Sequence, residues 1–377
     1  MKKRLAKLIS LSLVGVMAIS LAACGGGNSE NNNSSAGGEK GAKSDVTVGI
    51  VVKTATNAHF QDIAYGAAIA GEDLGVNVEI DNTATESDIE GQITKCENLI
   101  SKGVDALILT PNDSKGVSGA VEAAHTAGIP FVTVDTEIDN IWGDNVKEYL
   151  PNYIGVDHTQ MAYEMIHQVL EKMGGKGNVV ILRGMDAASS SQERTAGIEK
   201  AISEFPDVKV VESQSANYDQ DTAATKMANI LQAHSDVDAV FCCNDLMAMG
   251  AITALKEQGK EVGGDNGVIV TGIDGNVIVL ESIKNGELYA TAYDWSILQG
   301  YYAVEQAVAL INDEEVPETT MTPDTVITSE NIDDYLPHGE ELSQWKMGTA
   351  VGEISDYMRN FIEMGEGLSS SGDAKAE

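Results

Sequence analysis

Short apolar segments that alternate with helical patterns constrain the fold of this chain more than any other feature. The first series contains four apolar runs, VTVGIVV, VNVEI, DALILT and PFVTVD, separated by helical patterns at residues 60–74, 88–102 and 114–127. Strands that alternate with helices form a parallel sheet, because each helix packs back onto the sheet through a right-handed crossover. The first part of the chain therefore predicts an α/β lobe.

A second series of the same kind follows an irregular stretch at 137–152. Its apolar runs are YIGVD, NVVILRG, VKVVESQ, AVFCCND and VIVTGID, with helical patterns at 160–173, 192–204, 222–233 and 247–257. Two similar halves predict two Rossmann-like lobes with parallel sheets. We expect three strands to cross between the lobes and to act as a hinge, near 152–157, 293–296 and 322–328.

The predicted domain boundaries follow from this pattern. The N-terminal lobe comprises residues 45–155 and 295–322, and the C-terminal lobe comprises residues 156–294 and 323–336. Residues 337–377 form a C-terminal extension, in which Ile354, Met358, Phe361 and Ile362 have helix-like spacing within 351–364. The last residues, 369–377, are polar, and we expect this end to be disordered.

The amino terminus has the composition of an export signal. Four basic residues at positions 2, 3, 4 and 7 precede a largely apolar stretch at 8–19 and the sequence Leu-Ala-Ala-Cys at 21–24. We therefore interpret residues 1–23 as a signal peptide, since the apolar stretch is shorter than the ~20 residues of a membrane span. The sequence before Cys24 resembles a bacterial lipobox, in which the Cys24 thiol is acylated. The alternative is a plain signal peptide followed by an ordinary cysteine.

Residues 24–44 contain almost no apolar side chains and predict a disordered tether. We expect an extracytoplasmic protein that is held at the bacterial cell membrane only by this lipid anchor. The chain has 24 basic and 58 acidic residues, a formal net charge of −34, which disfavours nucleic-acid binding. Cys96, Cys242 and Cys243 lie in apolar segments, and we expect buried thiols rather than a disulfide framework or a metal site.

Polar or acidic residues follow several of the predicted strands. Asp135, Asn244, Asp274 and Asp294 all stand where an apolar run ends. In an open parallel sheet, ligands bind beyond the carboxyl ends of the strands. Carboxylates accept hydrogen bonds from adjacent hydroxyl groups, so these positions predict a site for a small polyhydroxylated ligand.

Five segments taken together resemble the type I periplasmic sugar-binding proteins, the ribose-binding group in particular: VTVGIVVKTATNAHFQDIAYGA, PFVTVDT, SQERTAGI, AVFCCNDLMAMGAITAL and VIVTGIDGN. The resemblance covers about residues 46–336. It implies a solute-binding protein, not an enzyme, that closes over a small sugar or polyol and delivers it to an ABC permease. Sugar-responsive repressors share these motifs but carry a DNA-binding headpiece, where this chain has an export signal. We expect a monomer without cofactor or metal.

The resemblance also implies the ligand-binding residues, which are Asn57, His59, Phe60, Asp135, Thr136, Arg194, Tyr218, Asn244, Asp274 and Asp294. Thr136 stands where ribose binders have an arginine, and Asp294 where they have a glutamine. If both face the ligand, the charge of the site shifts by two negative units, so an amino sugar or aminocyclitol is an alternative ligand. Phe60 and Tyr218 suit the apolar face of a sugar ring, with Trp142 or Trp295 near the rim.

Each of these residues also has a structural interpretation. The strand-end acids could cap helices or turns, and the aromatic residues could belong to the core. Arg194 and Asp294 could form structural ion pairs, and His59 could be a solvated loop residue. Paired acids invite a glycosidase interpretation, but the sequence contains no serine-hydrolase elbow, dinucleotide-binding loop or calcium loop. A ligand-presenting sensory protein for a membrane receptor or kinase remains a functional alternative.

Overall fold

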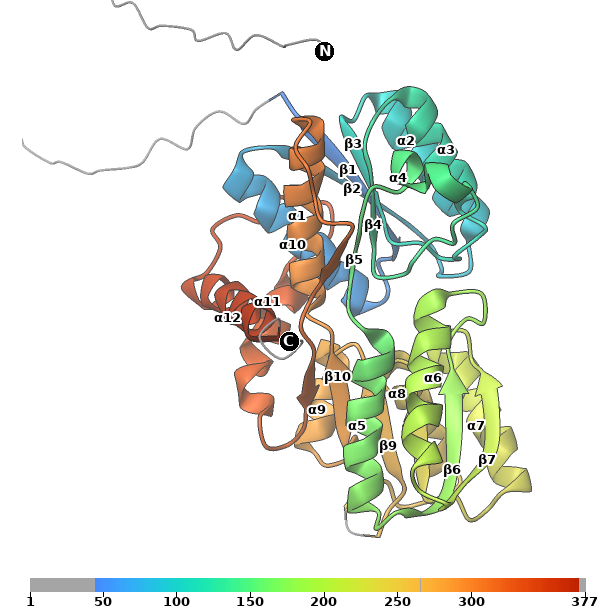
Figure 1. Cartoon of the computed structure of the whole chain (residues 1–377). Helices are drawn as coiled ribbons and strands as arrows, with labels where there is room; N and C mark the ends of the chain where they lie inside the picture. Colours follow the sequence, from blue (N-terminus) through green and yellow to red (C-terminus); the bar gives the residue numbers. More distant parts are fainter. Residues whose placement is uncertain (1–44, 265, 373–377) are drawn as a thin grey trace, which may run out of the picture. The chain divides into compact units, whose positions relative to one another are not determined.

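The computed structural model describes residues 45–264 and 266–372, and within these ranges the chain forms two six-stranded sheets with helices on both faces (Figure 1). The predicted signal peptide, Cys24 and the tether lie outside the described residues. In the described part of the chain, no helix is both long enough and apolar enough to cross a membrane. Two lobes with mainly parallel sheets were the predicted fold, and this prediction is confirmed.

The first sheet is parallel throughout. Its strands, in spatial order, are β11 (Thr319–Met321), β5 (Tyr153–Gly155), β4 (Phe131–Val134), β3 (Ala106–Leu109), β1 (Thr47–Thr54) and β2 (Asn77–Thr83). Helices α1 (Ala58–Leu74) and α10 (Ser296–Ile311) cover one face, and α2 (Ile89–Lys102) and α3 (Ser118–Ala127) cover the other. Alternate residues of β1 show why both faces are buried: Ile50 packs in the α1 and α10 core, and Val51 packs in the α2 and α3 core.

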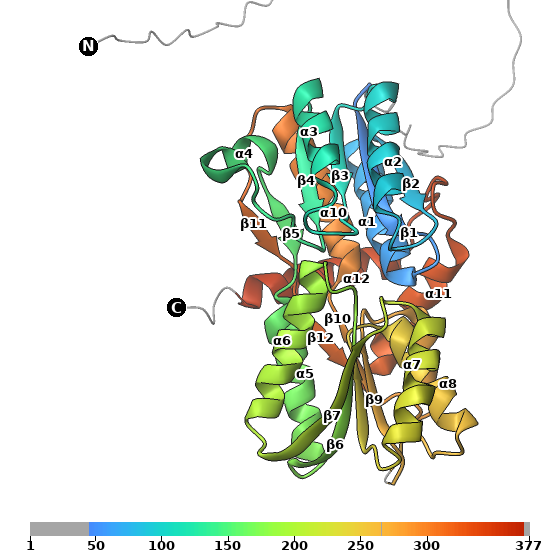
Figure 2. The same ribbon diagram turned by 90° about the vertical axis from the view of Figure 1, so that its right-hand side faces the viewer.

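The second sheet differs by one antiparallel pair, formed by its edge strand β12 with β10. In spatial order its strands are β12 (Thr325–Ile327), β10 (Ala290–Tyr293), β9 (Ile269–Ile273), β8 (Ala239–Cys242), β6 (Lys176–Arg183) and β7 (Asp207–Ser215). Figure 2 shows α5 (His158–Lys172) and α6 (Ser189–Ser203) on one side of this sheet, and α7 (Gln220–Ala233) and α8 (Asp245–Glu257) on the other.

The chain passes between the two sheets three times: after β5, after β10, and between β11 and β12. The second passage leads directly into α10, which crosses α1 closely. Gly66 of α1 and Gly300 of α10 make this approach possible, since a methyl group at either position would overlap a backbone carbonyl of the other helix. Residues at or just beyond the carboxyl ends of β1, β4, β8 and β9 lie together in one region of the molecule.

Several helices differ from the predicted ones. The sequence pattern does not predict α9 (Val277–Lys284) or α10, because α9 begins with the strand-like run VIVL and α10 contacts the first sheet, α1 and α12 (Asp356–Gly372), which leaves no single apolar stripe. Helix α3 begins four residues later than predicted. The irregular stretch at 137–152 contains the short helices η1 (Gly143–Asn145) and α4 (Val146–Tyr149). All three cysteines within the described residues are buried, as predicted.

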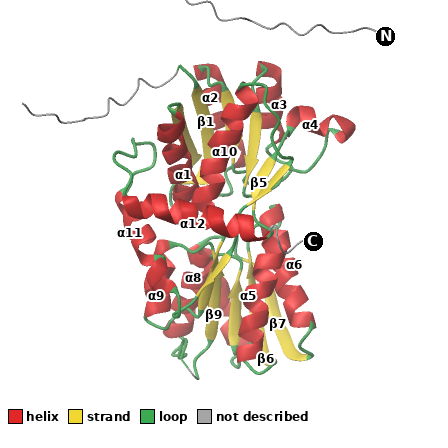
Figure 3. Cartoon of the chain, turned by 60° about the vertical axis from the view of Figure 1, so that its left-hand side comes forward, coloured by secondary structure: helices red, strands yellow, loops and turns green. Residues whose placement is uncertain are grey.

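The C-terminal extension packs against helices of both lobes, and Figure 3 shows α12 lying across the region between the two sheets. Helix α11 (Leu336–Gln344), preceded by η2 (Ile332–Asp334), contacts both α1 and α9. Helix α12 begins after Ser355, whose hydroxyl oxygen accepts from the backbone N–H of Met358 at 3.0 Å. It continues to Gly372, so the expectation that the chain is disordered from residue 369 is wrong for residues 369–372.

Candidate ligand-binding site

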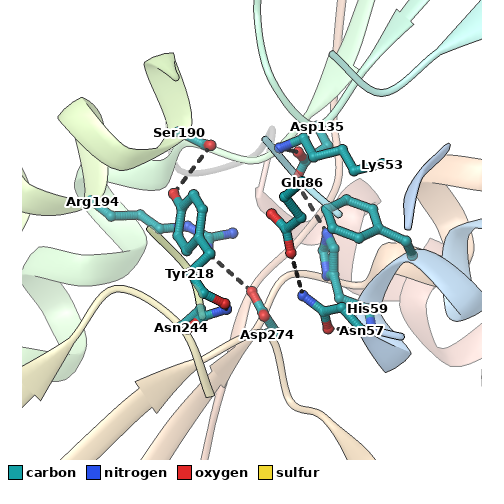
Figure 4. Close-up of a pocket in the computed structure, with 11 residues that line it drawn as sticks. Lys53, Asn57, His59, Glu86, Asp135, Ser190, Arg194, Tyr218, Asn244 and Asp274 are labelled. Atoms are coloured by element: carbon teal, nitrogen blue, oxygen red, sulfur yellow. Dashed lines mark hydrogen bonds and ion pairs between the residues drawn. The ribbon is translucent and has the colours of Figure 1, made fainter. Parts of the chain in front are cut away.

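A pocket with an empty volume of about 210 Å³ lies between the carboxyl ends of the two sheets (Figure 4). It is lined by eleven residues: Lys53, Asn57, His59, Phe60, Glu86, Asp135, Ser190, Arg194, Tyr218, Asn244 and Asp274. Eight of the ten predicted residues are among them. The other two, Thr136 and Asp294, are fully buried and contact the lining residues from behind.

Two of the lining residues combine a helix cap with a place in the pocket. Asn57 caps α1, where its Oδ1 accepts from the N–H of His59 at 3.1 Å, and Asn244 caps α8, where its Oδ1 accepts from Met247 at 2.9 Å. Asn57 also accepts a 3.1 Å hydrogen bond from Asn276 of the other lobe. These caps hold the side chains in fixed orientations, so their amide groups are preorganised.

The backbone is strained at the acids and at one aromatic residue of the pocket. Asp135, Tyr218 and Asp274 have φ angles of 67°, 60° and 121°, and Trp295, next to Asp294, has 50°. Non-glycine residues in this region cost about 1–3 kcal/mol each and cluster at functional sites. Asp135 and Asp274 still donate their N–H groups to the neighbouring strands, at 2.9 Å to Ile154 and 2.8 Å to Ala292. The strain therefore lies where each strand turns its terminal acid into the pocket.

On the first lobe, Asp135 is surrounded by donors. Lys53 Nζ lies 2.9 Å from one carboxylate oxygen and 2.8 Å from the hydroxyl of Thr136, while His59 Nε2 lies 3.1 Å from the other oxygen. Burial alone would raise the pKa of Asp135, but Lys53 and His59 hold it well below its usual range. Burial opposes the charge on His59 too, yet Asp294, Asp274 and Asp135 raise its pKa to about 10. Asp135 and His59 are therefore both charged at neutral pH.

On the second lobe, Arg194 is the centre of a buried network. Its Nη1 donates to Asp274 and to the Cys243 carbonyl oxygen, both at 2.9 Å, and its Nη2 lies 3.5 Å from Asp294. Its Nε donates to Nδ1 of His158 at 3.2 Å. Burial and the charge of Arg194 lower the pKa of His158 to about 3, so this histidine is neutral and donates from Nε2 to the Asp135 carbonyl oxygen at 2.9 Å.

Asp294 joins the two networks. It is fully buried, with one oxygen 3.6 Å from His59 Nδ1 and the other 3.5 Å from Arg194. Burial raises the pKa of Asp294 to about 6, and the charges of His59 and Arg194 limit the rise. Asp294 therefore forms ion pairs with bases of both lobes, and it supports the lining residues His59 and Arg194 from behind.

The predicted shift of the site by two negative units is not supported by this geometry. Neither Thr136 nor Asp294 lines the pocket. Lys53, which the sequence analysis missed, places a cation beside Thr136, and His59 adds a second base. Three bases, Lys53, His59 and Arg194, thus balance Asp135, Asp274 and Asp294. The sequence contains one indication of this role: Lys53 is a charged residue in an otherwise largely apolar strand, VTVGIVVKT.

His59, Asp135 and Asp294 have one ligand atom each within 4.8 Å of one another, which is compatible with a metal ion. However, both nitrogens of His59 face carboxylates, and Lys53 and Arg194 contact the same two acids. A further cation would be repelled by three positive charges. This group of residues is better described as a network of ion pairs.

Two aromatic rings border the pocket. Phe60 and Tyr218 are 3% and 5% exposed, and Lys53 Nζ lies 5.1 Å from the centre of the Phe60 ring and 6.0 Å from that of Tyr218. The Tyr218 hydroxyl group lies 3.3 Å from that of Ser190. The two tryptophans expected near the rim lie elsewhere: Trp295 stacks on Phe361 and Trp142 on Tyr149.

Comparison with known proteins gives the family of this fold and site. The family described as the periplasmic binding protein domain matches residues 48–315. The chain belongs to this family. Members of the periplasmic binding protein family are solute-binding proteins that act outside the cytoplasm and are not enzymes, which confirms the predicted class.

Individual proteins similar to this chain are also solute-binding proteins. The chain is 34% identical to the ribose import binding protein RbsB of Bacillus subtilis, over 75% of this chain and 87% of that protein. It is 29% identical to the xylitol-binding protein of Mycolicibacterium smegmatis, over 70% and 72% of the two chains. An ABC transporter periplasmic solute binding protein from Actinobacillus succinogenes, solved with bound D-allose, superposes with a TM-score of 0.72 at 32% identity, covering 77% of this chain and 100% of that one.

Proposed function

We propose that this protein captures a neutral monosaccharide or small polyol between its two lobes and delivers it to an ABC permease. The observation that carries the proposal is the pocket itself, in which hydrogen-bonding groups from both sheets surround a space bordered by two aromatic rings. Hydroxyl groups both donate and accept, so they match a mixture of carboxylates, amides and a guanidinium group. The C–H face of a sugar suits Phe60 or Tyr218.

The ion pairs of Asp135 and Asp274 favour a neutral ligand over an amine at these two acids. Asp135 is paired with Lys53 and His59, and Asp274 with Arg194, so neither acid depends on a cationic ligand for neutralisation. A ligand ammonium group near Lys53 would instead meet a like charge. The named ligands of the three relatives, ribose, xylitol and D-allose, are also consistent with a neutral polyol.

Closure of the lobes is the proposed mechanism of capture. The pocket takes Asp135 from the first sheet and Asp274 from the second, so a ligand that bonds to both stabilises the closed arrangement. The three passages between the sheets are the proposed hinge. A permease would then recognise the fixed relative position of the two lobes.

A thermal-shift screen of neutral monosaccharides and polyols tests this proposal. A ligand at 100 times its Kd stabilises the folded state by about 2.7 kcal/mol, which raises the Tm by several degrees. Asp274→Ala should abolish the shift, while Asp207→Ala, at an exposed position in β7, should retain it. If no compound in the panel shifts the wild type, or if Asp274→Ala responds normally, the proposal is wrong.

We further propose that Cys24 carries the lipid anchor. In a bacterial host grown with an alkyne-labelled fatty acid, the wild-type protein should take up the label and sediment with membranes. Cys24→Ser should be unlabelled and released. An unlabelled wild-type protein would favour the plain signal peptide.

A further inference from the structure

Glu86 lines the pocket, although it was not among the predicted ligand-binding residues. It lies in the loop between β2 and α2, among exposed residues, and its side chain reaches into the pocket, where it is only partly exposed. Its Oε1 accepts one hydrogen bond, from Asn57 Nδ2 at 3.2 Å. A carboxylate can accept several more, so Glu86 has unused capacity toward the pocket.

Unlike the lining acids Asp135 and Asp274, Glu86 forms no ion pair with a base in the part of the chain that the structure describes. Asp135 and Asp274 each have a base within 2.9 Å, and Asp294 behind them lies between two. Among the described residues, no lysine, arginine or histidine nitrogen lies within 4.0 Å of the Glu86 carboxylate. Since the other three acids are balanced by three bases, an ionised Glu86 leaves the site with one net negative charge.

The groups that face Glu86 come from several elements. Lys53 is the last but one residue of β1, Asp135 follows β4, Asp274 follows β9, and His59 and Arg194 project from α1 and α6. Burial raises the pKa of Glu86 to about 7, Asp274 and Asp135 add to the rise, and Lys53 and the Asn57 hydrogen bond limit it. At neutral pH, a small change in its surroundings therefore changes its protonation.

Resting on the function proposed above, we infer that the Glu86 carboxyl group binds the ligand directly and becomes protonated when a neutral polyol is captured. A neutral ligand displaces water from the carboxylate without supplying a positive charge, so the ionised form becomes more costly. The protonated group donates one hydrogen bond and accepts another, which matches a hydroxyl group. The proton comes from solvent, and ligand capture is coupled to its uptake.

The sign of the pH dependence follows from this coupling. The complex holds more protons than the free protein, so affinity for a neutral polyol falls as pH rises through the pKa of free Glu86. With that pKa at about 7, and with full protonation in the complex, affinity is about eightfold lower at pH 8.0 than at pH 6.5. A ligand carrying an ammonium group would reverse the sign, because it would stabilise ionised Glu86.

Calorimetric titration with D-ribose, D-allose and xylitol at pH 6.5 and 8.0 tests the inference. For the probe that binds the wild type most tightly, the affinity at pH 8.0 should be lower than at pH 6.5, by up to about eightfold. At pH 7, titrations in phosphate and in Tris should differ by the ionisation heat of up to about half a proton per ligand. Glu86→Gln keeps the shape of the side chain, and it should abolish both effects.

Glu193→Gln is the matched control. Burial, with the nearby Glu137 and Asp157, also raises the pKa of Glu193 to about 7, but Glu193 does not line the pocket. This variant should keep the pH dependence of the wild type. If wild-type binding is independent of pH, or if the pH dependence survives in Glu86→Gln, the inference about Glu86 is wrong, while the proposed function is unaffected. Affinity for a neutral probe that rises with pH also overturns the inference, because the ionised Glu86 carboxylate would then be the form that binds, and no binding of any probe overturns the proposed function as well.

Discussion

Replacement of Arg194 by methionine tests whether the buried ion pairs hold the two lobes of the site together. Arg194 is 3% exposed and contacts Asp274 at 2.9 Å and Asp294 at 3.5 Å. Methionine retains most of the apolar contact of the side chain but removes the charge. Both carboxylates then remain buried, and Asp274 loses its base.

The size of the effect can be worked from these contacts. Removing one partner of a buried ion pair costs about 3–5 kcal/mol, because the other charge stays desolvated. The Cys243 carbonyl oxygen and His158 Nδ1 also lose their donor, at about 1–3 kcal/mol for each acceptor left unsatisfied. Burial of the methionine side chain returns about 1.5–3 kcal/mol. Together these ranges give a net loss of about 2–9 kcal/mol in the free energy of unfolding.

Urea unfolding at pH 8 and at pH 5.5 measures this loss. Asp294 has a folded pKa of about 6, above the value of an unfolded aspartate, and removal of Arg194 raises it further. Its ionised form is therefore unfavourable in the folded variant, and the loss should be smaller at pH 5.5 than at pH 8. Adding Asp294→Asn to Arg194→Met should recover part of the stability for the same reason.

Arg183→Met is the matched control. Arg183 pairs with Asp186 at the surface, with side chains 31% and 62% exposed, so its replacement should cost less than about 1 kcal/mol. If Arg194→Met also costs less than about 1 kcal/mol, or if its effect does not depend on pH, the buried ion pairs of Arg194 do not stabilise the folded protein.

Two further predictions concern the C-terminal extension, which packs against both lobes. Phe361→Ala should lower the free energy of unfolding by about 3–5 kcal/mol, since its buried ring stacks on Trp295 at 4.8 Å and on His338 at 4.5 Å; thermal denaturation measures it, and a loss below about 1 kcal/mol would show that α12 is only loosely attached. Burial opposes ionisation of Asp62, but the charge of His338 and hydrogen bonds from His338, Ser296 and Tyr293 hold its pKa below the usual value. The stability that ionised Asp62 contributes should be present above the unfolded pKa of about 3.9 and be lost as pH falls below it. In Asp62→Asn, the free energy of unfolding should therefore fall less steeply as the pH is lowered below about 4. The same steepness in wild type and variant would refute this.

Much of the pocket could be predicted from the sequence, because ligands bind beyond the carboxyl ends of the strands in an open parallel sheet. Asp135 and Asp274 follow buried strands, and the parallel sheets bring both to one pocket, as the alternation of strands and helices indicates. The capping alternative is not what their contacts show, since both carboxylates accept hydrogen bonds from side chains: Lys53, His59 and Thr136 at Asp135, and Arg194 and Asn276 at Asp274. The local pattern was sufficient here because strand ends and helix caps are set by nearby residues.

Other features depend on contacts between distant parts of the chain. Lys53 is separated from its partner Asp135 by 82 positions, so an apolar strand pattern could not show that its amine is paired inside the pocket. Glu86 lies in the polar loop sequence TATESD, which is typical of a solvated turn. Position alone assigned Thr136 to the pocket, whereas its hydroxyl group contacts Lys53 behind the lining. The charge balance of the site therefore required the structure.

A crystal structure of the protein with the neutral polyol that gives the largest thermal shift would show whether both lobes bind one ligand. We expect one ligand in the pocket, with hydroxyl groups within about 2.5–3.2 Å of Asp135 on the first lobe and of Asp274 and Arg194 on the second, and a C–H face on Phe60 or Tyr218. A ligand bound outside this pocket, or one that contacts the side chains of only one lobe, would contradict the proposal that this protein captures sugars by closing both lobes over them.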